Sequence, residues 1–149
     1  DDAGYLSTNM FMNKHSSAGG GNGVFTLYNQ IGDHFWNLLQ FISTKVPADK
    51  IVYMIMHEES NELGEIKPKT IGKLLDEKVC VEGMFTIVLR CIAESNKHLF
   101  VTQASDGAVS KSPIGMFEDL TIDNDILLVE KAIRDYYELG GTGEDEKTK

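Results

Sequence analysis

The amino-acid sequence predicts an α/β fold, with one domain over residues 1–139 and a mostly parallel sheet. Between Phe25 and Val46, apolar residues recur at three- and four-residue steps, which predicts an amphipathic helix ended by Pro47. The run Ile51–Met56 (IVYMIM) is apolar at every position, as is typical of a strand covered on both faces. A helix leading into such a strand indicates a parallel sheet with helices packed on it.

The remaining elements follow from local patterns. Phe85–Ala93 and His98–Gln103 are expected to pair as an antiparallel β-hairpin, and Ser105–Gly107 to form a second turn. The last helix is expected to begin near Asp123 as its N-cap, to bury a stripe of apolar residues, and to end at Gly140 and Gly141. The other expectations are a weak helix (Gly4–His15), a flexible loop (Ser16–Gly23), a polar loop (Glu58–Lys69), a short helix (Thr70–Lys78), the stripe (Ile126, Val129, Ile133, Tyr136) and a disordered acidic tail (140–149).

The charge and composition exclude several classes of protein. A net charge of −9 argues against a nucleic-acid-binding surface that extends over the whole domain, because neutralising phosphates requires clustered Lys and Arg. No apolar run approaches the roughly 20 residues of a membrane-spanning helix, so we expect no membrane partner. Cys80 and Cys91 lack metal-ligand spacing and are expected to be buried, reduced thiols in a cytoplasmic protein. Because the chain begins with Asp-Asp and not Met, we expect a piece of a longer protein.

Two candidate functional residues lie at the ends of predicted strands. His57 directly follows Ile51–Met56, and ligands of α/β proteins bind at the carboxyl ends of strands. The alternative is a histidine whose hydrogen bonds go to the local backbone. Asp1 and Asp2 are suited to contact a hydrated Mg²⁺ ion if a strand ends at them, and are otherwise simply exposed acids.

Two groups of lysines are candidates for contact with an anion. Lys67, Lys69 and Lys73 lie within seven residues around Thr70, and Lys69 and Lys73 share a face if a helix begins there. Lys111 leaves the predicted hairpin on the turn Lys111-Ser112-Pro113. The alternative for each group is an ordinary solvated lysine.

Several motifs of nucleotide-binding and hydrolytic enzymes are absent from the sequence. It contains no G-x-x-x-x-G-K-[ST] phosphate loop and no G-x-G-x-x-G after a strand. The glycines at 19–21 and 23 lack both the lysine and the strand that a phosphate loop requires. No serine or cysteine nucleophile has a convincing base partner.

The order of these motifs resembles the carboxyl-terminal part of bacteriophage RecA-like P-loop ATPases, beginning at the end of the Walker B strand. The resemblance covers about residues 1–138, and its most specific pieces are Lys69–Asp76 (KTIGKLLD) and Lys111–Phe117 (KSPIGMF). It implies a RecA-like three-layer sheet, mostly parallel with an antiparallel hairpin, whose amino-terminal phosphate-loop part is missing. The proteins it resembles act in phage DNA recombination and single-strand annealing, which implies that this protein is located in the host cytoplasm.

The resemblance also implies roles for individual residues. Asp1 and Asp2 would contact Mg²⁺ through water, and His57 would sense the γ-phosphate of ATP. Lys111 would reach the nucleotide of a neighbouring subunit. Residues 58–69 would face single-stranded DNA or another copy of the protein. Lys67, Lys69 and Lys73 would be the contacts with the DNA or with the other copy.

The resemblance implies a function for the longer protein and leaves alternatives open. ATP and Mg²⁺ would be its cofactors, whereas residues 1–149 alone are expected neither to bind a cofactor nor to hydrolyse ATP, because the phosphate loop is absent. One alternative is a non-enzymatic interaction scaffold. Another is a structural component of a phage that reuses the fold.

Overall fold

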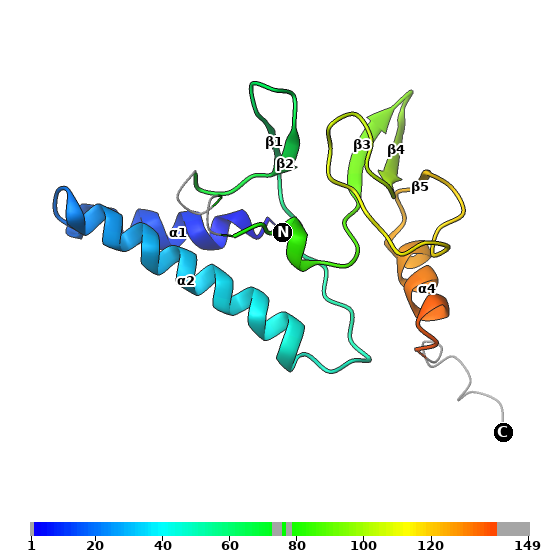
Figure 1. Cartoon of the computed structure of the whole chain (residues 1–149), viewed down its shortest axis with the longest axis horizontal. Helices are drawn as coiled ribbons and strands as arrows, with labels where there is room; N and C mark the ends of the chain where they lie inside the picture. The colour runs from blue at the N-terminus through cyan, green and yellow to red at the C-terminus, as the bar shows by residue number, and fades with distance from the viewer. Residues whose placement is uncertain (1, 73–75, 77–78, 140–149) are drawn as a thin grey trace. The chain divides into compact units, whose positions relative to one another are not determined.

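A computed structural model of the chain describes residues 2–72, 76 and 79–139, which form two compact units, Asp1–Phe85 and Thr86–Lys149 (Figure 1). The single domain expected over residues 1–139 stays a prediction. The expected disordered tail, residues 140–149, lies outside the described residues.

Two packed helices open the first unit. Helix α1 (Gly4–Lys14) is followed by the 3-10 turn η1 (His15–Ser17) and by α2 (Asn22–Lys45), so both expected helices are confirmed. The rings of Phe11 and Tyr28 lie 5.2 Å apart where α1 contacts α2. The large buried side chains of α2 are four residues apart, which keeps them on one face of a helix with 3.6 residues per turn. They are Leu27, Ile31, Phe35 and Leu39.

The segment Ile51–Met56 is not the buried interior strand that its composition predicts. The side chain of Ile55 is 61% exposed, and Val52 and Tyr53 are also exposed. Among the described residues its only β pairing is one parallel bridge between Ile55 and Asp2. Met54 and Met56 pack on the core cluster of Phe35, Leu39, Val79 and Val81. No second layer of described residues covers the other face, so only one side of the segment is buried.

A short β-hairpin replaces the polar loop expected over Glu58–Lys69. Strand β1 (Glu58–Ser60) pairs antiparallel with β2 (Ile66–Pro68). The Asn61 side chain organises the tip, because its Oδ1 accepts hydrogen bonds from the backbone N–H groups of Leu63 and Glu65, each 2.9 Å long. Gly64 has φ 79°, a left-handed conformation that glycine adopts readily. Most of the short helix expected over Thr70–Lys78 lies outside the described residues.

The second unit is built on a three-stranded antiparallel sheet in the order β3-β4-β5. The expected hairpin is confirmed with shorter strands, β3 (Arg90–Glu94) and β4 (Lys97–Val101), and β5 (Thr121–Asp123) pairs with β4. Ser95 and Asn96 form the two-residue turn, with φ 48° and 66°, as the tight hairpin turn with two left-handed residues requires. The expected second turn is also present, because Ser105 and Ala108 pair around Asp106 and Gly107.

Helix α4 (Ile126–Tyr136) begins later than the sequence predicts. Asp123 is the last residue of β5, and the N-cap is Asp125, whose Oδ1 accepts a 2.9 Å hydrogen bond from the N–H of Leu127. The predicted apolar stripe is only half buried. Val129 and Ile133 are buried, whereas Ile126 and Tyr136 are exposed.

The expected fold class is therefore wrong. The described residues form two small antiparallel sheets, of two and three strands, with the helices α1, α2 and α4. They do not form a RecA-like three-layer, mostly parallel sheet, because the Asp2–Ile55 bridge is their only parallel pairing. The buried environment expected for Cys80 and Cys91 is also wrong, since both residues are exposed.

Removing the Phe35 side chain tests the core of the first unit. Phe35 is 4% exposed, so Phe35→Ala should lower the free energy of unfolding by about 3–5 kcal/mol, through lost burial and the cavity left behind. Phe41 lies on the same helix but is 57% exposed, so Phe41→Ala should change it by about 0.5 kcal/mol or less. Urea unfolding of both variants measures the difference, and equal losses would contradict this description of the core.

Candidate functional site

The structure brings two of the predicted site residues, Asp2 and His57, into contact. The N–H of Ala3 donates a 2.7 Å hydrogen bond to the carbonyl of Ile55, which places the residues around Asp2 beside the end of the Ile51–Met56 segment. His57 Nε2 then lies 3.5 Å from Asp2 Oδ2. The Asp2 side chain is only 16% exposed, whereas the His57 imidazole is 73% exposed. The pair is thus a partly buried carboxylate with an accessible imidazole beside it.

The backbone around Asp2 holds its carboxylate in place. Asp2 Oδ1 accepts a 2.8 Å hydrogen bond from the N–H of Gly4, the first residue of α1, where the helix dipole favours negative charge. A Cβ atom on Gly4 would lie 3.0 Å from this oxygen and 3.6 Å from the carbonyl of Lys69, so a larger residue would crowd the carboxylate. The carbonyl of His57 accepts a 2.7 Å hydrogen bond from the N–H of Lys69. Three chain segments therefore meet at Asp2.

This arrangement limits the chemistry available to the pair. One oxygen of Asp2 is taken by the Gly4 N–H and the other faces His57, which suits contact with a hydrated cation better than direct coordination. Within the described part of the chain, no three His, Cys, Asp or Glu side chains group so as to hold a metal ion. The exposed imidazole can donate or accept a hydrogen bond or a proton.

Lys67 lies in a network of carboxylates. Its ammonium donates a 3.0 Å hydrogen bond to Asp76 Oδ2 and lies 4.0 Å from Glu59 Oε1. The Thr70 hydroxyl donates to the other oxygen of Asp76. The hydrogen bond to Asp76 raises the pKa of Lys67 above its ordinary value, and the negative charges of Asp76, Glu59 and Glu82 add to this effect, while desolvation opposes it. Its charge is largely balanced within the protein, and its contact with DNA stays a prediction.

The other predicted lysines lie in different settings. Lys69 is exposed and is joined to His57 through its backbone N–H. Lys111, in the second unit, pairs with Val88 through two backbone hydrogen bonds of 2.8 and 2.9 Å. Ser112 beside it donates from Oγ to the carbonyl of Thr102, which holds the Lys-Ser-Pro turn against the sheet. Lys73 and Asp1 lie outside the described residues.

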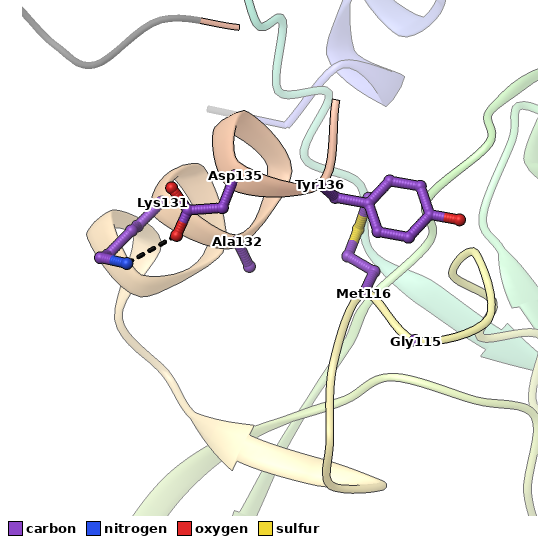
Figure 2. Close-up of a pocket in the computed structure, with 6 residues that line it drawn as sticks. All are labelled: Gly115, Met116, Lys131, Ala132, Asp135 and Tyr136. Atoms are coloured by element: carbon purple, nitrogen blue, oxygen red, sulfur yellow. Dashed lines mark hydrogen bonds and ion pairs between the residues drawn. The ribbon is translucent and has the colours of Figure 1, made fainter. Parts of the chain in front are cut away.

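The second unit contains a pocket that the sequence reasoning missed. It has a volume of about 390 Å³ and lies between the Gly115–Met116 turn and α4 (Figure 2). Lys131 Nζ and Asp135 Oδ2, 2.6 Å apart on one turn of the helix, largely neutralise each other. The spacing of this ion pair is visible in the sequence, but the packing of α4 against the turn is not. The lining residues are Gly115, Met116, Lys131, Ala132, Asp135 and Tyr136.

Comparison with known proteins gives no relative for this chain: no family model, no curated protein and no solved structure matches it. None of the helices in the part of the chain that the structure describes is long and apolar enough to cross a membrane.

The raised pKa of Lys67 predicts a loss of stability at alkaline pH. A lysine whose pKa is higher in the folded than in the unfolded chain contributes its full stabilisation below the unfolded pKa of about 10.4 and loses it as the pH rises through the folded pKa. The difference in free energy of unfolding between the wild type and Lys67→Gln should therefore shrink at alkaline pH. Thermal unfolding across this range measures it. In an Asp76→Asn background the dependence should become smaller, because the largest cause of the raised pKa is removed while Glu59 and Glu82 remain. A difference between the wild type and Lys67→Gln that does not vary with pH would contradict the assignment.

Proposed function

We propose that this chain is the carboxyl-terminal portion of a phage ATP-binding protein that acts in DNA recombination or replication. The observation that carries the proposal is the contact between Asp2 and His57, 55 residues apart in sequence and 3.5 Å apart between their side chains. The resemblance implies that His57 contacts the γ-phosphate and that Asp2 contacts the hydrated Mg²⁺ ion. Both contacts are to the same bound Mg-ATP. Two residues with these roles must lie close together.

The surroundings of the pair give further support. The imidazole of His57 is exposed, so a ligand can reach it, while its backbone is held by Lys69 and its side chain lies against Asp2. His57 also leads directly into the β1–β2 hairpin. A change in the hydrogen bonding of His57 can therefore alter the position of the hairpin, because Glu58, the first residue of β1, is covalently bonded to His57. The proposal rests on these residues and motifs and not on the overall fold.

The cofactors of the proposed function are ATP and Mg²⁺. Bound Mg-ATP would supply the phosphoryl group to be transferred and a cation that neutralises its developing charge. Asp2, whose carboxylate is oriented by the Gly4 N–H, fits a contact to the hydration shell of the cation. His57 would donate a hydrogen bond to a phosphate oxygen. The phosphate-binding loop must come from sequence outside these 149 residues, which contain none.

Substitution of His57 tests the sensor role, in a protein that joins this chain to its phosphate loop. We expect His57→Ala to leave ATP binding largely intact and to abolish the stimulation of ATP hydrolysis by single-stranded DNA. The reason is that the residue reporting the γ-phosphate to the hairpin is lost. Nucleotide binding and steady-state hydrolysis, each with and without DNA, measure the two effects. His34→Ala, at an exposed position on α2, is the matched control and should keep both.

Two outcomes would contradict the proposal. Normal DNA-stimulated hydrolysis by the His57→Ala protein would remove the sensor role and leave His57 as a polar residue that follows an extended segment. A coding sequence upstream of Asp1 without a phosphate loop, in the roughly 60–100 residues expected from the size of such a domain, would remove the function itself. The non-enzymatic scaffold would then be the better explanation.

A further inference from the structure

The segment Ile51–Met56 combines exposed apolar side chains with an incompletely paired backbone. Ile55 is 61% exposed, and Val52 and Tyr53 are exposed as well. Exposed β-branched and aromatic residues are common in strands and rare in succession on a solvated surface. The segment contains no charged residue, glycine or proline. It therefore has the composition of a strand whose pairing is incomplete.

One edge of this segment is already in use. The carbonyl of Ile55 accepts from the N–H of Ala3, and the carbonyl of His57 accepts from the N–H of Lys69. Gly4, which follows Ala3, lies close to Lys69, since a Cβ atom on it would be 3.6 Å from the Lys69 carbonyl. In an extended chain the backbone groups of successive residues point to opposite edges, so those of every second residue point to the same edge. Ile55 and His57 thus share the edge that faces α1.

The alternate residues define the other edge. Within the described part of the chain, the backbone N–H and C=O groups of Val52, Met54 and Met56 make no hydrogen bond. The side chains of Met54 and Met56 pack on the core, which positions the backbone of these two residues. An edge of unpaired N–H and C=O groups is a template for pairing, because another extended chain satisfies a whole row of them at once.

The chemistry of this edge selects its partner. An uncharged row of apolar side chains gives no attraction for phosphate, which excludes a nucleic acid. An apolar strand with a free edge of its own satisfies both the backbone groups and the exposed side chains. Every copy of this chain carries such a strand, and two identical strands can pair with each other antiparallel about a twofold axis.

We infer that Ile51–Met56 is a strand-addition edge through which two copies of this chain pair antiparallel and form a dimer. The register centred on Met54 places Val52 opposite Met56 and Tyr53 opposite Ile55, an aromatic and β-branched pair. This register satisfies the backbone groups of all three unpaired residues together. The edge facing α1 is already hydrogen-bonded at Ile55 and His57, so a second copy pairs along the other edge, and this pairing closes at two copies instead of propagating into a fibre. The pairing does not depend on the proposed function.

Sedimentation equilibrium of residues 1–149 over a range of concentrations tests this inference. We expect the wild type to be a dimer that dissociates on dilution. Val52→Pro removes an N–H from the pairing edge, and Ile55→Lys places a charge on the exposed face, so each should raise the dissociation constant by roughly tenfold or more. Leu63→Lys is the matched control, because Leu63 is 86% exposed at the hairpin tip, away from this segment, and its dimer should be unchanged.

Amide hydrogen exchange gives a second measurement that does not depend on how the variants fold. In the wild type the amides of Val52, Met54 and Met56 should exchange more slowly at concentrations where the dimer forms than where it dissociates. A wild type that stays monomeric at every concentration would overturn the inference. A dimer that persists in both segment variants and is lost in Leu63→Lys would overturn it equally, because the hairpin tip would then be the interface.

Discussion

The hydrogen bond from the N–H of Ala3 to the carbonyl of Ile55, 2.7 Å long, connects the beginning of α1 to the end of the Ile51–Met56 segment. It closes a loop of about 50 residues that contains both α1 and α2, and closing such a loop has a large entropic cost that other contacts must offset. The carboxylate of Asp2 adds two contacts beside this hydrogen bond: it accepts a hydrogen bond from the N–H of Gly4, and it lies next to the imidazole of His57. The arrangement of the candidate site depends on this meeting of the two segments.

One-sided burial is the second constraint on the first unit. Helix α2 presents one apolar face, and Phe35 and Leu39 on that face share a core with Val79 and Val81. Met54 and Met56 complete this core from the Ile51–Met56 segment, which leaves the opposite face of the segment in contact with solvent. Burial on one face fixes the position of the segment, but it does not supply hydrogen-bonding partners along both of its backbone edges. This explains both the accessibility of His57 and the open edge from which the dimer is inferred.

Patterns that act over a few residues predicted the structure well. The four-residue repeat of α2 and the turn at Ser95 and Asn96 needed no information from distant parts of the chain. The start of α4 was predicted too early, because Asp123 and Asp125 are both suitable N-cap residues. Asp123 instead belongs to β5, and Asp125 is the N-cap. The buried strand expected at Ile51–Met56 failed for a different reason, because apolar composition shows that a segment can be buried on two faces but not that two layers exist to bury it.

The candidate site could be predicted only in part, for the same reason. A polar residue after an apolar run pointed to His57, and the resemblance pointed to Asp2, but only the structure joins them. The interaction of Lys67 with Asp76, nine residues away, could not be foreseen, because charge spacing alone does not separate an internal ion pair from an anion-binding face. The hairpin tip depended on one side chain, Asn61, in a stretch whose composition is that of a loop.

The juxtaposition of Asp2 and His57 is the central claim, and nuclear Overhauser spectroscopy of the isotope-labelled chain tests it most directly. We expect cross-peaks between the protons of Asp2–Ala3 and those of Ile55–His57, which the 2.7 Å hydrogen bond places within reach. Asp2→Ala should also shift the imidazole resonances of His57 and leave those of His34 on α2 unchanged. Absence of these cross-peaks in the folded chain, with a His57 imidazole that does not respond to Asp2→Ala, would contradict the account.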